Sequence, residues 1–340
     1  SDGVSAKLVS LATEVSYENS AQIVTGGEVS RQSVRNSILR LGGIEKRPEE
    51  GAAKRKVREL HVFADEDHVH MQKECKEKGK KIRAVPLVTV TEGVEKESKG
   101  RNRTKEAMHF VDEKFNTKEL WKSVEGYIGS TYDTDVLEKI YLHADGGRWI
   151  RNGLEKFSNV RRVMDGFHLE KKLKEAVRRF PNRNLKSRIK DAMEADDRKK
   201  LDRILQSLYD ACKSEKDNEF VSEFGKYLFG NYGAIRNRLI YGEVGSCTEG
   251  QVSHVLSKRF SRNPMGWSEE GLGKLTKQRV YVKNRGKIEA KDFRTKEKAR
   301  DSYGGYAERI IKEACEGALD FSIFEKGIPI FDGNSGKQNM

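Results

Sequence analysis

The sequence predicts an α/β protein whose central sheet combines antiparallel and parallel strands and whose second half is largely helical. Strand-like runs of apolar and β-branched residues occur within residues 59–91 and again within residues 139–164. A segment with helical periodicity, residues 117–139, lies between these two regions. Residues 166–245 are helical throughout in pattern. Strands that alternate with helices are typical of an α/β sheet.

The first 45 residues predict three short helices. Ser30 is suited to cap the third, in which Val34, Ile38 and Leu41 fall on one face. A Gly26-Gly27 pair breaks the chain before that helix, since glycine tolerates turn conformations that other residues resist. The segment therefore looks helical and separate from the rest of the chain.

The polar face of residues 30–41 decides how this helical segment is interpreted. It carries Arg31, Gln32, Arg35 and Asn36. A helix-turn-helix with residues 30–41 as the recognition helix would place these side chains on DNA. Short helices joined by a glycine turn also form plain three-helix bundles with a solvated polar face, so both interpretations stay open.

A charge-dense linker, residues 46–58, precedes the strand signals. Strands are predicted over residues 59–65, 68–72 and 82–91, with a lysine-rich connection between the second and the third. Pro86 predicts an edge or bulged position because proline cannot donate a ladder hydrogen bond.

The following segments complete the sheet. After the helix of residues 117–139, a strand is predicted over 139–144, a helix over about 147–157 and a strand over 160–164. Three strands, then helix, strand, helix and strand is the order that a ribonuclease H-like fold requires: an antiparallel meander extended by parallel strands through helical crossovers.

The predicted domain organisation follows from these elements. It consists of a helix-turn-helix region (1–45), a linker (46–58), a ribonuclease H-like core (59–165), an all-helical insertion (166–245), the end of the core (246–276) and a basic C-terminal tail (277–340). The tail is rich in Lys and Arg and poor in apolar residues, so it is expected to be extended and partly ordered.

The charge of the chain favours a polyanionic partner. The 340 residues include 66 Lys and Arg against 53 Asp and Glu, a formal net charge of +13. Basic side chains gain affinity by releasing counterions from phosphates, although the same charge can simply keep a protein dispersed. Four cysteines form no close pair, and no run of about 18 apolar residues exists. We expect a reducing, cytoplasmic location, on the nucleoid when DNA is bound, and no membrane association.

Two strands of similar sequence end on a carboxylate. Leu60-His61-Val62-Phe63-Ala64-Asp65 and Tyr141-Leu142-His143-Ala144-Asp145 are both apolar runs that deliver an aspartate. Side by side at one edge of a sheet, Asp65 and Asp145 would hold a hard divalent cation, which prefers oxygen ligands. Asp67 competes with Asp65, since alternation puts both on one face of an extended strand.

A third carboxylate lies in the predicted end of the core. Thr248 is suited to cap a helix in which Val252, Val255 and Leu256 point inward, so Glu249 would lie in its first turn. Taken alone, Glu249 reads as a charge that meets the helix dipole favourably.

Taken together, these residues resemble a known family. The blocks are Phe63-Ala64-Asp65-Glu66-Asp67-His68-Val69, Ala144-Asp145-Gly146, Asp165-Gly166-Phe167-His168 and Glu249-Gly250-Gln251-Val252-Ser253-His254, followed by Arg259, Ser261, Arg262 and Pro264-Met265-Gly266-Trp267-Ser268. In this order they resemble a branch of bacterial insertion-sequence transposases that is catalogued as an uncharacterised protein family and is related to the Mutator-type transposases. The resemblance covers about residues 15–275, and members usually carry a longer N-terminal region.

The resemblance implies an Asp-Asp-Glu triad of Asp65, Asp145 and Glu249 that binds two Mg²⁺ ions, with Mn²⁺ able to substitute. Asp67, Asp165 and His168 would support the site; Asp165 also reads as a helix N-cap beside a surface histidine. The implied activity is hydrolysis at the ends of an insertion sequence, followed by attack of the freed 3′-hydroxyl on target DNA. The implied partners are element ends, target DNA and a second protomer when two ends are synapsed.

Two other functions fit the same sequence. A metal-dependent nuclease of the same fold would cut DNA or RNA without strand transfer. A DNA-binding protein without catalysis would use only the N-terminal helices and the basic helical segment. The presence of all three carboxylates argues against the second of these.

Overall fold

The structure is a computed structural model that describes residues 1–45, 52–77, 79, 81–98, 101–151, 153–241, 247–263 and 265–293. The chain divides into two compact units, one formed by Lys7–Ile288 and the other by Ser1–Ala6 with Glu289–Met340. The first unit contains the sheet, nearly all of the helices and every candidate site residue.

The first unit is built on a mixed five-stranded sheet, as the sequence predicts. Its strands are β1 (Glu59–His70), β2 (Ile82–Thr91), β5 (Met108–Phe110), β6 (Lys139–Ala144) and β7 (Val160–Met164). Their order is β5-β2-β1-β6-β7. β1, β2 and β5 pair antiparallel, whereas β6 pairs parallel with β1 and with β7. β1 is therefore the strand where the antiparallel and parallel halves meet.

The antiparallel half contains different strands from those predicted. Residues 59–65 and 68–72 were predicted as two strands, but β1 runs without a break from Glu59 to His70. Its charged middle stays in the sheet because all three carboxylates there have donors: the Glu66 N–H donates to Asp65, Trp149 Nε1 to Glu66, and Ser257 and Ser261 to Asp67. The third antiparallel strand is the three-residue β5, which is too short to leave a sequence signal.

Pro86 lies in a strand that has neighbours on both sides. It pairs with Glu66 of β1, whereas β5 pairs with residues 88–90 of β2. At residue 86 the described strands therefore flank β2 on one side, so the missing proline N–H is tolerated there. The predicted edge position is correct locally, although β2 as a whole is an inner strand.

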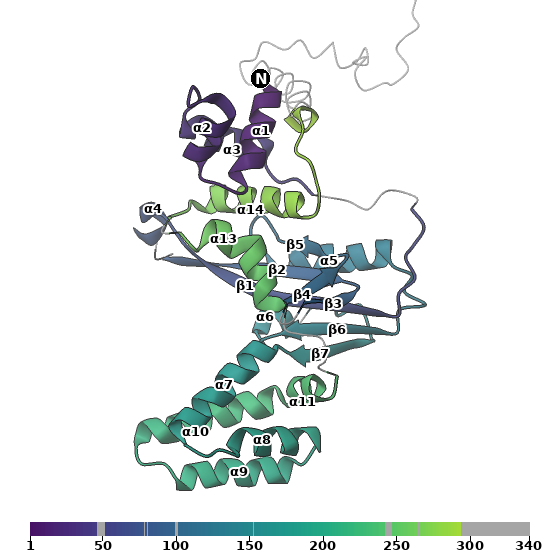
Figure 1. Ribbon diagram of the computed structural model, residues 1–340, viewed down its shortest axis with the longest axis vertical. Helices are drawn as coiled ribbons and strands as arrows, with labels where there is room; N and C mark the ends of the chain where they lie inside the picture. The colour runs from purple at the N-terminus through teal and green to yellow at the C-terminus, as the bar shows by residue number, and fades with distance from the viewer. Residues whose placement is uncertain are drawn as a thin grey trace, which may run out of the picture. The chain divides into compact units, whose positions relative to one another are not determined.

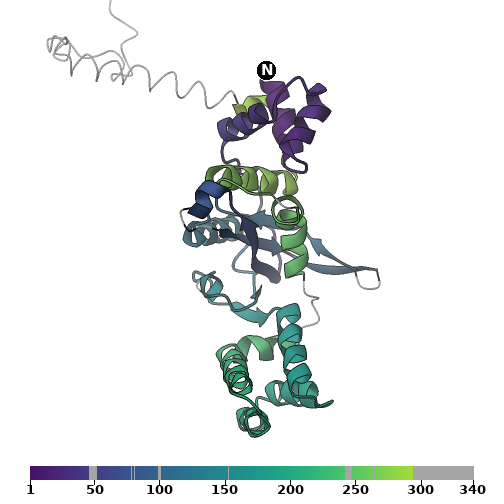
Figure 2. The same cartoon turned by 90° about the vertical axis from the view of Figure 1, so that its left-hand side faces the viewer.

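Three further elements were not predicted. The strands β3 (Gly93–Ser98) and β4 (Arg101–Lys105) form a separate two-stranded sheet that extends away from the main one (Figure 2). A short helix, α4 (Lys73–Glu77), lies in the connection between β1 and β2. All three segments are rich in charged residues, which hides their regular structure in the sequence.

One face of the sheet packs against α5 (Thr117–Thr131). Leu120, Trp121, Val124 and Ile128 of this helix are buried against alternate residues of β1, β2 and β6. The helix is predicted to continue to residue 139, but it ends at Thr131, and the next residue, Tyr132, is fully buried in an extended conformation. A short helix, α6 (Arg148–Arg151), precedes β7 in place of the predicted helix over 147–157.

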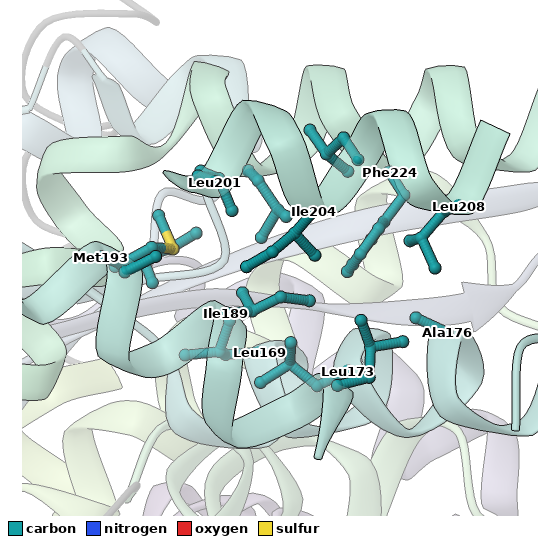
Figure 3. Packing of buried hydrophobic residues seen from close by; sticks show 14 of the residues in the cluster. Leu169, Leu173, Ala176, Ile189, Met193, Leu201, Ile204, Leu208 and Phe224 are labelled. Atoms are coloured by element: carbon teal, nitrogen blue, oxygen red, sulfur yellow. The ribbon is translucent and has the colours of Figure 1, made fainter. Parts of the chain in front are cut away.

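The stretch predicted to be wholly helical contains α7 (Gly166–Arg179), α8 (Leu185–Glu194), α9 (Arg198–Asp210), α10 (Glu215–Gly230) and α11 (Tyr232–Tyr241). These helices gather on the β7 side of the sheet, where α11 contacts β7 (Figure 1). They share a hydrophobic core of their own, in which Leu173, Ile189, Ile204 and Phe224 are all nearly inaccessible to solvent (Figure 3). Residues 242–245 of the predicted insertion lie outside the described residues.

The N-terminal helices α1 (Asp2–Ala12), α2 (Tyr17–Thr25) and α3 (Arg31–Leu41) lie where the sequence predicts them. Ser16 and Ser30 cap α2 and α3, and Val34, Ile38 and Leu41 are buried. The segment is not separate, however. The Gln278 side chain, itself fully buried, donates at 2.9 Å to the carbonyl oxygens of both Ile38 and Gly42.

The partner of the N-terminal helices is α14 (Glu269–Lys283), which corrects the predicted start of the tail at residue 277. Gln278, Arg279 and Val280 are buried in this helix. Basic and polar residues were read as solvated tail, but here they satisfy carbonyl oxygens at the ends of other helices. Residues 294–340 of the predicted tail, and residues 46–51 of the predicted linker, lie outside the described part of the chain. In the remaining linker, Arg55 forms an ion pair with Glu92 at 2.8 Å.

A helix broken by a π-turn leads into α14. It consists of α12 (Thr248–Val252), a π-helical turn η1 (Ser253–Ser257) and α13 (Lys258–Phe260). Both α12 and η1 contact β1. Among the described helices, none combines the length and the apolar character needed to cross a membrane.

Candidate active site

Asp65 lies in β1, and its neighbour Asp145 directly follows β6, the strand that pairs in parallel with β1. β1 and β6 are paired in parallel up to Phe63 and His143, and the two aspartates continue this register two residues further. Because side chains alternate along a strand, both carboxylates lie on the face of Phe63 and His143, opposite the face that packs on α5. Asp145 Oδ1 accepts a hydrogen bond from the Gly147 N–H at 2.8 Å, which orients its carboxyl group.

A row of stacked rings precedes the two carboxylates on the same face of the sheet. The His143 ring stacks on Phe63 with a centroid distance of 4.6 Å and on His61 at 5.3 Å, and His61 stacks on Tyr141 at 5.1 Å. His61 Nδ1 and His143 Nε2 are 3.0 Å apart, so one ring donates to the other. Burial lowers the pKa of His61 and lowers that of His143 to about 3, so both rings are neutral at physiological pH.

Asp165 is the third aspartate at this edge of the sheet. It follows Met164, which pairs with Ala144, and its N–H donates to the Ala144 carbonyl oxygen at 2.8 Å. Asp165 is almost completely buried and caps α7, accepting from the N–H groups of Phe167 and His168. The His168 Nδ1 atom lies 3.2 Å from the same carboxyl oxygen. The N-cap reading of Asp165 is therefore correct.

The three aspartates and His168 form one electrostatic cluster. Burial raises the pKa of Asp65 to about 6, and the negative charges of Asp145 and Asp165 add to this effect while His168 opposes it. The hydrogen bond to Asp165, together with the charges of Asp65 and Asp145, raises the pKa of His168. Ionisation of Asp65 beside Asp145 is therefore unfavourable. A bound cation would offset this repulsion between the two carboxylates.

Asp67 has a structural role that differs from that of Asp65. It is buried, and its Oδ1 atom accepts hydrogen bonds from Ser257 at 3.1 Å and Ser261 at 2.9 Å. These two serines lie in η1 and directly after α13, so the Asp67 carboxylate fixes the broken helix to β1. Neither serine was singled out from the sequence for this role, because the contact spans about 190 residues. Of these two aspartates of β1, Asp65 is the one that interacts electrostatically with Asp145 and Asp165.

Glu249 lies in the first turn of α12, as predicted, and is exposed. Thr248 does not cap this helix; it is its first residue and is buried, and the cap position is Cys247. Val252, Val255 and Leu256 are buried as predicted. Within the described residues, no group of three or more His, Cys, Asp and Glu side chains is placed to hold one metal ion. The structure brings Asp65, Asp145, Asp165 and His168 together, whereas Glu249 lines a cavity with Gly166 and Phe167, the two residues that follow Asp165.

An open cavity of about 990 Å³ connects Glu249 with the residues that follow Asp165. Its lining includes Gly166 and Phe167 from α7, Lys190 from α8, Arg238 from α11 and Glu249 from α12. A side chain at Gly166 would collide with the Arg238 guanidinium, whose Nη2 atom would lie 2.7 Å from an added Cβ. Phe167 is 46% exposed, so this cavity offers an aromatic ring between basic and acidic groups.

The predicted DNA-binding residues lie on the accessible side of α3. Arg31, Gln32 and Asn36 are exposed, and Arg35 is half-buried. The Gln32 side chain donates to Asn36 at 3.1 Å. Trp267, from the last of the family blocks, is buried, donates to the Phe260 carbonyl oxygen at 3.0 Å and belongs to the core.

Comparison with known proteins gives the family of this chain. The model of the uncharacterised protein family UPF0236 matches residues 1–298. The chain belongs to UPF0236. Two relatives from Caldanaerobacter subterraneus subsp. tengcongensis are each 36% identical to it over 318 residues, or 92% of the chain. The chain spans 65% and 66% of their respective lengths. The name of the first joins eleven locus designations of one genome, and that of another relative, 35% identical, joins four. UPF0236 proteins are therefore present in many copies in that genome.

A solved structure is also similar to this chain. It is described as the Drosophila P element transposase strand transfer complex, with 11% identity over 85% of this chain and 82% of the other. The TM-score is 0.27, and a similarity of this size does not establish a shared fold.

Proposed function

We propose that this UPF0236 chain contains the catalytic core of a DNA transposase with a ribonuclease H-like sheet. The observation that carries the proposal is the pair Asp65 and Asp145, placed at the end of the parallel pairing between β1 and β6 on one face of the sheet. A sheet of three antiparallel strands followed by two parallel strands supports the same proposal, as does a basic chain from a family present in many copies.

The donor set fits divalent cations. Asp65 and Asp145 offer carboxylate oxygens, the ligands that Mg²⁺ and Mn²⁺ prefer. Burial and the neighbouring Asp145 raise the pKa of Asp65, so its ionised form is unfavourable without a cation. Glu249 is the proposed third ligand, from the helix that contacts the same strand. Two bound ions would supply activation of the attacking oxygen and stabilisation of the leaving oxygen at a phosphodiester.

The protein groups have separable tasks in this proposal. Asp65 and Asp145 hold the charge that faces the scissile phosphate. Asp165 fixes the first turn of α7 and holds His168, whose pKa is raised by the hydrogen bond to Asp165 and by the charges of the neighbouring aspartates. Lys190 and Arg238, which line the neighbouring cavity, supply positive charge along which a DNA strand would lie. DNA ends, target DNA and a second protomer during synapsis remain the proposed partners, in the cytoplasm on the nucleoid.

Strand transfer tests the proposal directly. A duplex that carries the genomic DNA flanking this gene, cut to expose a 3′-hydroxyl, is incubated with protein, a plasmid target and Mg²⁺. Joining should occur with the unaltered chain and fall by several orders of magnitude with Asp145→Asn, which removes charge but keeps size. Asp135→Asn, an exposed aspartate ten residues earlier, is the matched control and should join normally.

The other outcomes separate the alternatives. Cleavage of DNA or RNA that depends on Asp145, without any joining, identifies a nuclease. DNA binding that is equal in the unaltered protein and in Asp145→Asn, with neither cleavage nor joining, identifies a non-catalytic DNA-binding protein.

A further inference from the structure

A second cavity, of about 310 Å³, lies between the N-terminal helices and the turn that leads into α14. Arg31 and Arg35 of α3 line it together with Arg259 of α13. Tyr17 and Trp267 form aromatic parts of its wall. Glu18 is the carboxylate among its described lining residues, so positive charge exceeds negative charge there.

Arg259 is the deepest of the three arginines. It is 3% exposed, its Nε atom donates to the Ala12 carbonyl oxygen at 2.8 Å, and its guanidinium lies 4.9 Å from the centre of the Trp267 ring. Burial lowers the pKa of Arg259 to about 10, so it remains protonated at neutral pH, and Glu14 acts on it only from a distance. In the part of the chain that the structure describes, none of the ion pairs involves Arg31, Arg35 or Arg259, and Glu270 acts on Arg35 only through a longer-range electrostatic interaction.

Two helix ends add to this positive potential. Ser16 and Ser268, the N-cap residues of α2 and α14, both line the cavity. These helices have nine and 15 residues, and the N-terminal end of a helix carries a partial positive charge that favours anions. A buried charge without a counter-ion is costly, and an anion in the cavity would remove that cost.

We propose that this cavity is a phosphate-binding site, with Arg31, Arg35 and Arg259 as its ligands, and that it holds a backbone phosphate of DNA. The assignment of the phosphate to DNA rests on the proposed function, whereas the anion site rests on the cavity itself. Arg31 and Arg35 then position the DNA without reading its bases. Base contacts, if α3 makes any, are left to the exposed Gln32 and Asn36.

Inorganic phosphate is the first probe. Its effect on the thermal unfolding midpoint is measured against chloride at equal ionic strength. A ligand that binds only the folded state raises the midpoint as its site fills. A saturable rise is expected in the unaltered protein and in Lys199→Gln/Arg203→Gln, an exposed pair with the same spacing on α9, and not in Arg31→Gln/Arg35→Gln. An equal rise in all three proteins overturns the inference.

A random-sequence DNA duplex is the second probe, and its affinity is measured by fluorescence anisotropy at several salt concentrations. Each phosphate contact contributes about 0.9 to the slope of log affinity against log salt, so Arg31→Gln/Arg35→Gln should flatten that slope by about two units. Glu18→Gln should tighten binding, because it removes the negative charge of the cavity. Circular dichroism confirms that each variant is folded.

The two proposals fail in different ways. Strand transfer with an unchanged salt slope in Arg31→Gln/Arg35→Gln overturns the phosphate site and leaves the transposase proposal in place. A saturable phosphate response that depends on these arginines, without DNA binding by the unaltered protein, keeps the anion site and removes the transposase.

Discussion

At the scale of single residues, the two aspartates of β1 show how position within a strand separates two tasks. Asp65 and Asp67 share a face, yet one meets Asp145 and Asp165 while the other accepts hydrogen bonds from two serines. The sequence can place both on the same face through alternation. It cannot show which of them a helix 190 residues later will cover.

Asp65 should make stability depend on pH. Its pKa of about 6 in the folded chain lies above the ordinary value of 3.8. The contribution of protonated Asp65 to the free energy of unfolding is therefore fully present below pH 3.8 and is lost as the pH rises through 6. At pH 7, Asp65→Asn should therefore be more stable than the unaltered protein by up to about 3 kcal/mol, less any screening by solvent.

Urea unfolding at pH 4 and pH 7 without divalent cations measures this effect. The difference between the two proteins should nearly disappear at pH 4, and Mg²⁺ should reduce it at pH 7 by stabilising only the protein with both carboxylates. A constant difference at both pH values would show that Asp65 ionises in the folded chain as readily as in water.

Asp67 should be structural. Asp67→Asn keeps an oxygen that can accept from Ser257 and Ser261, so strand transfer should persist near its normal level. Asp67→Ala leaves the half-buried Ser261 hydroxyl without its acceptor and Ser257 with only the Val252 carbonyl oxygen at 3.4 Å, and should cost about 1 to 3 kcal/mol of unfolding free energy. Joining assays and urea unfolding on both variants test this; loss of joining in a stable Asp67→Asn would return Asp67 to the metal site.

At the scale of elements, α14 is the clearest difference between expectation and structure. Its fully buried Arg279 donates to the carbonyl oxygens of His254 and Val255 in the π-turn and of Thr13 at the end of α1. A π-turn is rare and frequently occurs near functional sites. Here the Arg279 guanidinium satisfies two carbonyl groups of the π-turn, so α14 stabilises the broken helix that carries Glu249.

Arg279→Met should be strongly destabilising, by about 3 to 5 kcal/mol, because three carbonyl oxygens lose a donor and Glu14 loses a buried partner. Lys283→Gln is the matched control, since Lys283 pairs with the same Glu14 at 2.8 Å but is partly exposed. It should cost at most about 1 kcal/mol. Equal losses in urea unfolding would show that the ion pair with Glu14, and not the π-turn, accounts for the effect.

The elements that sequence reasoning recovered are those with local signals. Caps such as Ser16 and Ser30, and apolar strands such as β6, are encoded within about ten residues. The missed features depend on partners far along the chain: the docking of α3 on Gln278, the uninterrupted β1 and the short β5. The pair Asp65 and Asp145 was found because two strands repeat one pattern, whereas the cavity around Arg259 has no local pattern at all.

At the scale of the whole molecule, the helices α7–α11 have a core that depends little on the sheet. Apart from Met164, its buried members all come from residues 169–235. A fragment of residues 165–241 should therefore fold alone into a helical protein with a cooperative urea transition. It should be less stable than the same segment in the full chain, because α11 would lose its contact with β7. Circular dichroism during urea unfolding measures both; a gradual loss of helicity would show that the sheet is required.

The stacked rings that precede the carboxylates affect which mutations would inactivate the protein. A slip of one residue between β1 and β6 would turn Asp145 to the opposite face of the sheet, and the stacked His61, Phe63 and His143 oppose such a slip. A selection for inactive variants will therefore recover two groups with the same phenotype. One group lacks a carboxylate. The other retains every carboxylate but has lost strand alignment, and substitutions at the His61–His143 pair belong to it.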